Sequence, residues 1–197
     1  MTLKYIITGA TGGLGGGVLQ QLSKHVPKSD IAASSSRPEA AKHFEPPGIQ
    51  FRHADYQDRA SLEKAFTGTL HCSNKLIVLK RSSSGIVYTS VREGIYAEAF
   101  PLFLNYYPSL KVLHLPNDGP VAYASRAELA EATANLMMQD GYEKEMVLLT
   151  GPKAVTLADL VVAINEATGK SIVVETLPPK EYVKASAKGD QGGRGEW

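Results

Sequence analysis

The 197-residue chain contains a single cysteine and no long apolar run. One cysteine, Cys72, excludes an internal disulfide and argues against a cysteine-built metal site. We interpret Cys72 as a small core residue, because nothing beside it marks an activated thiol. No apolar segment approaches the roughly 20 residues that cross a membrane as a helix, and Met-Thr-Leu-Lys leads into the first predicted strand without a signal-peptide pattern. We therefore expect a cytoplasmic protein that does not bind membranes.

An excess of charge of one sign is also absent. The chain has 21 Lys and Arg against 20 Asp and Glu, a net charge of +1, which gives no drive toward nucleic acid. The five histidines lie far apart, without the spacing of metal ligands. We expect neither a direct nucleic-acid partner nor a metal site. The length and the hydrophobic fraction of 43% are typical of one globular domain.

Glycine is concentrated in one stretch, Thr8–Gly15 (Thr-Gly-Ala-Thr-Gly-Gly-Leu-Gly), which follows the apolar residues Leu3–Ile7. Gly9, Gly12 and Gly15 stand where the turn from a first strand into a first helix receives the pyrophosphate of a dinucleotide. They allow a tight turn, close approach of the backbone to the phosphate and close packing of helix on strand. The N–H groups that begin the following helix point at the anion. The stretch and its context predict a dinucleotide site at this turn.

Apolar spacing along the first half of the chain alternates between strand and helix patterns, which predicts a doubly wound parallel α/β fold. The first helix has an apolar stripe from Leu14 to Val26 and ends before Pro27. The strand predicted at 75–79 has the continuous apolar composition of a buried parallel strand. The further predicted strands lie at 30–34, 49–53 and 75–79, and the helices between them lie at 37–44 and 60–66.

The next predicted strand, Ile86–Ser90, follows the previous one after only Lys80–Gly85. A parallel crossover needs about a dozen residues or more, usually with a helix, so two interpretations are open. Either the two strands form an antiparallel hairpin, or residues normally present between them are absent from this chain. We favour absence, because the other spacings agree with a regular alternating fold.

Two helix starts in the C-terminal half carry capping-box patterns, Ser125–Glu128 and Thr156–Asp159. Gly169 is placed to end the second of these helices. From Ala185 to Trp197 the sequence has no apolar period, and we predict no regular structure there. The strands expected in this half lie at 145–150 and 171–176.

The end of the second predicted strand, Ala33–Arg37 (Ala-Ser-Ser-Ser-Arg), bears on the choice of cofactor. NAD sites usually place an Asp or Glu there for the ribose 2′-hydroxyl, whereas this stretch has no acid and one guanidinium. Arg37 can bind a 2′-phosphate through charge-assisted hydrogen bonds, with the serine hydroxyls as further donors. We therefore predict NADP(H) as the cofactor, preferred over NAD(H). The alternative is a solvated surface arginine.

Other residues near these strand ends complete the predicted cofactor site. Asp55 and Tyr56 follow the third predicted strand and are candidates for the adenine side, whereas we interpret Asp58 as a helix cap. Thr11 can offer its hydroxyl or amide to the pyrophosphate. The predicted cofactor-binding residues are Gly9, Thr11, Gly12, Gly13, Leu14, Gly15, Arg37, Asp55 and Tyr56.

Several motifs spread over the chain together resemble the NmrA-like branch of the atypical short-chain dehydrogenase/reductase superfamily. The resemblance implies an NAD(P)-binding, Rossmann-like doubly wound parallel sheet with a small C-terminal α/β lobe. We accordingly expect one domain over 1–197, with the dinucleotide-binding core at 1–90 and a mixed core and substrate lobe at 91–197. The motifs are the glycine turn at 8–15, His53–Asp58, Ile86–Ser90, Val91–Glu98, Val121–Glu128 and Leu148–Pro152.

The same resemblance implies that this chain is shortened. Compared with the family, it lacks the helix between the fourth and fifth strands and a long stretch between Ser90 and Val91, and its end at Trp197 comes early. In relatives these stretches supply much of the nicotinamide pocket. We therefore expect a complete phosphate turn beside a reduced substrate side.

Three residues are candidates for that substrate side. Tyr96 and Glu98 match a family element that lines it, and the alternative for them is a structural turn with a packed aromatic ring. Tyr88 is the third candidate, although we favour its interpretation as an ordinary strand residue, with Thr89 and Ser90 as the loop edge beside the nicotinamide.

The function implied by the resemblance is NAD(P)H-dependent oxidoreduction of a small molecule, a quinone or carbonyl compound. We interpret the sequence as lacking the Tyr-x-x-x-Lys pair that serves ordinary short-chain dehydrogenases, in which the tyrosine is the acid. We assign no catalytic residue, so whether the chain is an enzyme stays open. One alternative is a non-catalytic redox sensor that binds NADP(H) and regulates a protein partner. Another is a family member that carries out a non-redox reaction.

Overall fold

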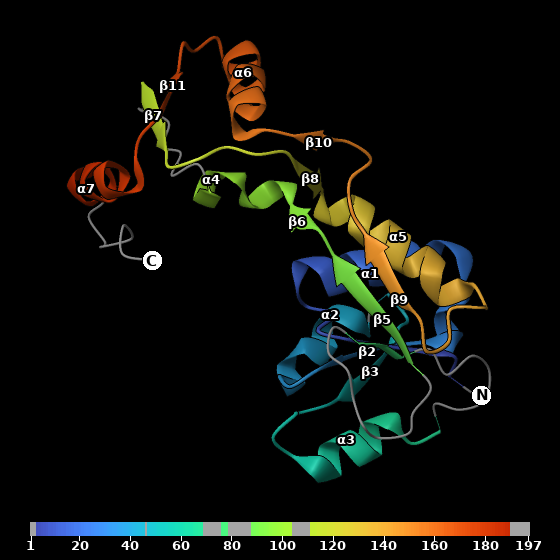
Figure 1. Cartoon of the computed structure of the whole chain (residues 1–197). Helices are drawn as coiled ribbons and strands as arrows, with labels where there is room; N and C mark the ends of the chain where they lie inside the picture. Colours follow the sequence, from blue (N-terminus) through green and yellow to red (C-terminus); the bar gives the residue numbers. More distant parts are fainter. Residues whose placement is uncertain (1–2, 46, 69–75, 79–87, 104–110, 190–197) are drawn as a thin grey trace. The chain divides into compact units, whose positions relative to one another are not determined.

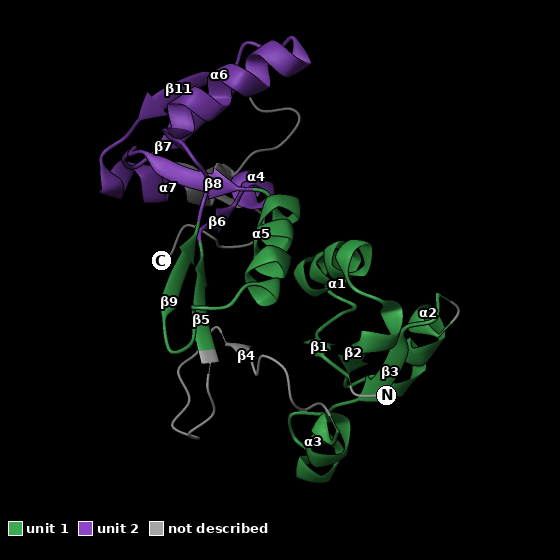
Figure 2. Cartoon of the chain, turned by 90° about the vertical axis from the view of Figure 1, so that its right-hand side faces the viewer, with its two compact units in different colours: residues 1–93, 125–149 green, residues 94–124, 150–197 purple. Residues whose placement is uncertain are grey.

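The computed structural model describes residues 3–45, 47–68, 76–78, 88–103 and 111–189 (Figure 1). The chain divides into two compact units, shown in different colours in Figure 2. The predicted boundary at residue 90, between a dinucleotide-binding core and a substrate lobe, is not tested by this division and stays a prediction. Unit 1 comprises residues 1–93 and 125–149, and unit 2 comprises residues 94–124 and 150–197.

A parallel three-stranded sheet in the order β1-β2-β3 begins unit 1. Tyr5 pairs with Ile31 and Ala32 pairs with Gln50, so the carboxyl ends of the three strands lie at one edge. The predicted alternation is confirmed, although the helix predicted at 37–44 is a 3-10 turn followed by one turn of α-helix. The elements are β1 (Tyr5–Thr8), α1 (Gly13–His25), the 3-10 turn Lys28–Asp30, β2 (Ile31–Ser35), the 3-10 turn Pro38–Ala40, α2 (Ala41–Phe44), β3 (Gln50–His53) and α3 (Arg59–Phe66).

The apolar stripe of α1 packs against this sheet. Val18, Leu19 and Leu22 are buried and share a core with Ile31 and Ala33 of β2. Leu22 and Ile31 are both 0% exposed, and full burial of an aliphatic side chain of this size stabilises a fold by about 1.5–3 kcal/mol. This packing holds α1, and the turn that precedes it, against the strands.

A second parallel sheet of unit 1 has the order β4-β5-β9, from β4 (Leu76–Val78), β5 (Tyr88–Glu93) and β9 (Met146–Leu149). Leu76 lies opposite Tyr88 in a parallel ladder. An antiparallel hairpin between these strands is therefore wrong. The parallel pairing agrees with the favoured interpretation, in which residues normally present in the crossover are absent.

β5 runs without a break through the point where a long stretch is expected to be missing. The sequence predicts a strand that ends at Ser90 and missing residues before Val91, yet residues 88–93 form one strand. Its first half pairs with β4 as far as Ser90, and its second half pairs with β9 from Ser90 to Glu93. Val91, directly after the expected junction, is 1% exposed. The expected junction thus lies inside one continuous strand, which pairs with β4 before the junction and with β9 after it.

Unit 2 contains two small sheets, one in the order β10-β8-β6 and one that pairs β11 with β7. Buried apolar residues of β7 and α6, such as Leu113 and Val161, form its core. α7 continues to Gly189, so the prediction of no regular structure from Ala185 is wrong over 185–189, where Ala and Lys favour a helix without an apolar stripe. The elements are β6 (Ile95–Tyr96), the 3-10 turn Ala97–Ala99, α4 (Phe100–Phe103), β7 (Val112–Leu115), β8 (Val121–Ala124), β10 (Ala154–Val155), α6 (Leu157–Thr168), β11 (Val173–Thr176) and α7 (Pro179–Gly189).

Both predicted capping boxes are confirmed. At the start of α5 (Arg126–Met138), the backbone N–H and the hydroxyl of Ser125 donate to the Glu128 carboxylate, each at 2.8 Å, and the Glu128 N–H donates to the Ser125 hydroxyl at 3.2 Å. Thr156 and Asp159 form the same arrangement before α6, which ends at Gly169 with a φ of 68°. Among the described helices, none has the length and apolar character needed to cross a membrane.

The capping box of α5 predicts a pH effect. Hydrogen bonds from the Ser125 backbone N–H and then from its hydroxyl lower the pKa of Glu128. Stability from this carboxylate is therefore present above the ordinary glutamate pKa and is lost as the pH falls through the lowered value. We expect Ser125→Ala to raise the Glu128 pKa part of the way to its ordinary value, as measured by NMR titration of the carboxyl carbon. An unchanged titration would contradict the assigned role of the hydroxyl.

Candidate functional site

The glycine stretch forms a tight turn from β1 into α1. Gly9 has a φ of +64°, a left-handed conformation that glycine adopts without strain. The Gly12 N–H donates to the Gly9 carbonyl oxygen at 2.8 Å. Gly12 is the N-cap of α1 and makes no side-chain capping bond, and the first turn carries no acidic residue. The first N–H groups of α1 are therefore available to an anion.

Gly15 brings α1 close to the end of β1. A Cβ at this position would lie 2.5 Å from the carbonyl oxygen of Gly9 and 3.2 Å from that of Thr8. Both are backbone atoms, so they have little freedom to move aside. Close packing of helix on strand, predicted for the last glycine of the motif, is what the structure shows at Gly15.

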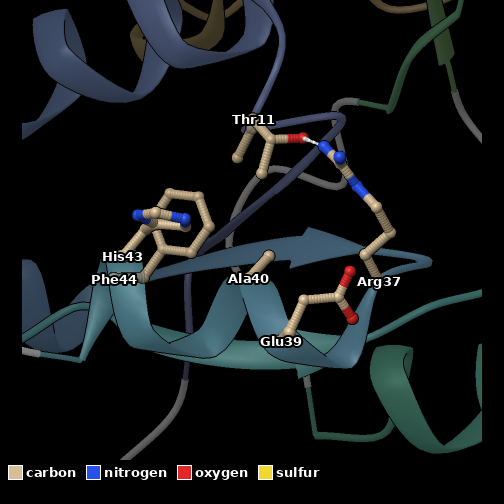
Figure 3. A pocket seen from close by; sticks show the side chains of 7 residues that line it. Thr11, Arg37, Glu39, Ala40, His43 and Phe44 are labelled. Atoms are coloured by element: carbon tan, nitrogen blue, oxygen red, sulfur yellow. Dashed lines mark hydrogen bonds between the residues drawn. The ribbon is translucent and has the colours of Figure 1, made fainter.

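A pocket of about 360 Å³ lies beside this turn (Figure 3). Arg37 crosses from the end of β2 and donates from Nη2 to the hydroxyl of Thr11 at 3.1 Å. The structure thus brings together two predicted cofactor residues that are 26 positions apart in the sequence. The lining residues are Ala10, Thr11, Arg37, Glu39, Ala40, His43 and Phe44.

Two of the three serines before Arg37, Ser34 and Ser35, are not placed as the expected phosphate donors, whereas Ser36 is exposed and its role stays a prediction. Ser34 is 0% exposed, and Ser35 is 9% exposed. The Ser35 hydroxyl accepts a hydrogen bond from the Arg37 backbone N–H at 3.2 Å. Because alternate residues of β2 are buried on both faces of the sheet, these hydroxyls cannot face a ligand. Ser35 instead holds the backbone from which the Arg37 side chain extends.

Glu39, His43 and Phe44 are pocket residues that the sequence reasoning missed. Glu39 and His43 are four residues apart on successive helical turns and line the same pocket (Figure 3). Phe44 is buried and stacks on Phe51 of β3, with 6.0 Å between ring centroids. The pocket therefore combines an apolar floor with one guanidinium, one carboxylate and one imidazole.

The predicted adenine-side residues follow β3 and do not line this pocket. The Asp55 carboxylate accepts from the Gln57 N–H at 2.9 Å and so shapes its own turn. Tyr56 is 74% exposed. Asp58 accepts from the Ala60 N–H at 3.0 Å, which confirms it as the cap of α3. A role for Asp55 or Tyr56 at the adenine stays a prediction.

The substrate-side candidates lie on other elements. Tyr88 begins β5, and its side chain lies outside the described part of the structure. Tyr96 ends β6 and is half-buried, and Glu98 is exposed in the 3-10 turn that follows. Both belong to unit 2, whereas the glycine turn and Arg37 belong to unit 1. Their roles stay predictions.

One Tyr-x-x-x-Lys spacing does occur, at Tyr107 and Lys111, and the sequence reasoning missed it. Tyr107 lies outside the described residues, as does Cys72. Pro108 disfavours a helical conformation of Tyr107, whereas the acid pair requires both side chains on one helix face. Lys111 directly precedes β7 and is not part of a helix. The local sequence therefore does not favour the helical arrangement that a Tyr–Lys acid pair requires.

Comparison with known proteins gives the family. No family model matches the chain. An NmrA-like family domain-containing oxidoreductase of Aspergillus flavus is 36% identical over 250 residues, which covers 98% of this chain and 80% of that protein. The chain belongs to the NmrA-like family. Quinone oxidoreductase 2 of Escherichia coli is 28% identical over 233 residues, covering 91% of this chain and 79% of that protein.

Solved structures agree with this membership and confirm the Rossmann-like α/β fold. A complex of an Escherichia coli NADPH-dependent quinone oxidoreductase with NADPH matches with a TM-score of 0.77 and 27% identity, over 98% of this chain and 85% of that one. A Citrobacter triphenylmethane reductase complexed with NADP(H) matches with a TM-score of 0.77 over 98% of this chain and 86% of that one. At 22% identity, this second match supports the fold alone.

The aligned lengths bear on the shortened middle of the chain. Both alignments, over 250 and 233 positions, are longer than the 197 residues of this NmrA-like chain. The relatives therefore carry residues within the aligned region that this chain lacks. This agrees with absent residues rather than a hairpin between β4 and β5.

The contact at Gly15 gives a testable prediction. We expect Gly15→Ala to lower the free energy of unfolding by roughly 1–3 kcal/mol, because the added methyl group overlaps the Gly9 carbonyl. Chemical denaturation of both proteins measures the change. Gly119→Ala is a matched control, since a Cβ there has nothing within 4 Å, and it should stay within about 0.5 kcal/mol of the wild type. Equal effects of the two substitutions would contradict the close helix–strand contact.

Proposed function

We propose that this chain is an NADP(H)-dependent oxidoreductase whose substrate is a quinone or carbonyl compound. The observation that carries the proposal is the uncapped first turn of α1 with Arg37 bound to Thr11 beside it. Membership of the NmrA-like family supports it, as do the names of the two relatives, an oxidoreductase and a quinone oxidoreductase. The NADPH held by the Escherichia coli enzyme supports the choice of cofactor.

The residues of the cofactor site have distinct tasks in this proposal. The first N–H groups of α1 bind the pyrophosphate, with the positive end of the helix dipole behind them. Arg37 moves from Thr11 to the 2′-phosphate, or binds both, because a guanidinium forms charge-assisted bonds with phosphate oxygens. Glu39 opposes this preference, since a carboxylate repels phosphate but can accept from a ribose hydroxyl. When bound, the nicotinamide supplies hydride transfer, and the protein contributes position and orientation.

The substrate side follows from unit 2. Tyr96 and Glu98 are the residues that we propose to contact the quinone or carbonyl compound. The chain would carry out this reaction in the cytoplasm. The alternative is a non-catalytic protein that regulates a protein partner through cofactor occupancy. The following experiment would favour this alternative if NADPH binds and no turnover is seen.

Turnover is tested with the purified chain, NADPH and a panel of benzoquinones, naphthoquinones and aldehydes. We expect NADPH absorbance to fall only when protein and acceptor are both present, with one acceptor reduced for each NADPH consumed. Heat-denatured protein is the control. Binding of NADPH by calorimetry without consumption for any acceptor would contradict the enzyme and leave a cofactor-binding protein.

Cofactor preference is tested at Arg37 and Glu39. We expect Arg37→Gln to reduce the ratio of NADPH to NADH affinity by about tenfold or more, because it removes a charge-assisted contact to the 2′-phosphate. Glu39→Gln should change the ratio in the opposite direction, because it removes a negative charge from the same pocket. Calorimetry with both dinucleotides measures the ratios. Equal losses for NADPH and NADH in Arg37→Gln would place Arg37 away from the 2′-phosphate.

A further inference from the structure

Helices α1 and α5 lie side by side in unit 1 (Figures 1 and 2) and touch through small residues. A Cβ added to Gly17 would come 2.8 Å from the Cβ of Ala130, and a Cβ added to Gly13 would come 2.9 Å from Nη1 of Arg126. Gly13 and Gly17 are four residues apart, as are Arg126 and Ala130, so each pair lies on one helix face. The two contacts together mean that α1 and α5 run in the same direction, with their first turns adjacent.

This register places the Arg126 guanidinium against the first turn of α1. Arg126 is the first residue of α5 and is exposed. Gly13 leaves room for the guanidinium at this position, because a Cβ there would lie 2.9 Å from Nη1. Glu128, the acidic residue in the first turn of α5, directs its carboxylate to Ser125. A positive charge therefore lies beside the uncapped N–H groups of α1.

We propose that Arg126 binds the pyrophosphate of the dinucleotide, an inference that rests on the proposed function. The first turn of α1 supplies N–H donors to that anion, and the guanidinium beside Gly13 adds charge-assisted hydrogen bonds. The sequence identified Val121–Glu128 through the family resemblance and Ser125–Glu128 as a capping box, and assigned none of these residues to the cofactor. The contact with Gly13 assigns one.

The two arginines then recognise different phosphates. Arg37 approaches from the end of β2 beside Thr11 and recognises the 2′-phosphate, which only NADP(H) carries. Arg126 approaches from the start of α5 beside Gly13 and recognises the pyrophosphate, which NADPH and NADH share. Arg37 thus sets the preference between the cofactors, and Arg126 raises the affinity for both.

The test is calorimetry of Arg126→Gln with NADPH, NADH and 2′-AMP, which carries the 2′-phosphate and no pyrophosphate. We expect both dinucleotides to bind about tenfold or more weakly, by the same factor, and 2′-AMP to bind as in the wild type. Arg37→Gln should instead weaken NADPH and 2′-AMP. Arg126→Lys retains the charge without the planar fork and should lose affinity by a smaller factor than Arg126→Gln.

Arg59→Gln is the matched control, because Arg59 is 91% exposed and pairs with Glu63 on α3; it should leave all three affinities unchanged. A wild type that binds neither dinucleotide overturns the proposed function itself. If the wild type binds both dinucleotides and both Arg126 variants bind them as tightly as the wild type, the role of Arg126 is overturned and the proposed function is not. Weaker binding of 2′-AMP in Arg126→Gln also overturns it, since that loss would come from the other phosphate or from the fold.

Discussion

The close contact between α1 and the carbonyl groups that end β1 is the constraint on which the candidate site depends. Gly15 approaches the Gly9 carbonyl at a distance that leaves no room for a side chain. Further along the helix, Leu22 is fully buried in the core that it shares with β2, and Gly17 touches Ala130 of α5. Three contacts along one helix thus fix where its first N–H groups point. Hydrogen bonds weaken steeply as their geometry departs from the ideal, so the small residues that allow this packing also set the geometry of the candidate anion site.

The second sheet forms in a chain that lacks residues carried by its relatives within the aligned region. Ladder hydrogen bonds involve only the backbone, so β5 can pair with β4 over one half and with β9 over the other without any particular side chain. Coverage of the sheet is a different matter. Met146 and Leu148 of β9 are 59% and 65% exposed, whereas parallel sheets are normally covered by helices on both faces. A missing crossover helix would leave the strand pairing intact and the apolar side chains of the sheet exposed, as seen here.

Local patterns predicted the first turn and several helix starts in both units, because the signals there are short-range. The glycine turn, the cap at Asp58 and the capping boxes at Ser125 and Thr156 each involve residues within a few positions of one another. Contacts between distant segments were not predictable in the same way. Asp118, for example, accepts from the N–H groups of Leu157 and Ala158 at 2.9 and 3.0 Å and so stabilises the start of α6 from about 40 positions away.

The candidate site shows the same limit. Arg37 was predicted from its place after β2, but nothing in the local sequence indicates that Ser34 and Ser35 are buried on the two faces of that strand. Nor does it indicate that Arg126 lies on Gly13, because that contact depends on the register between two helices. The strand junction at Ser90 was missed for a related reason. Comparison with a family pattern indicates that residues are absent between Ser90 and Val91. Only the strand pairing shows whether these two residues are joined in a loop or within one strand.

The residues proposed for the cofactor and those proposed to contact the substrate belong to different units. The glycine turn and Arg37 come from one continuous stretch at the start of the chain, and the helix pair that supports them involves only α1 and α5. Ser90, where we predict residues to be missing, belongs to the same unit but lies outside that stretch, so the proposed cofactor site can form without those residues. Hydride transfer requires from the protein mainly that both partners be positioned. In the proposed function, the predicted shortening acts on the acceptor side of the reaction, and the range of quinones or carbonyl compounds accepted is the property in which we expect this chain to differ from its longer relatives.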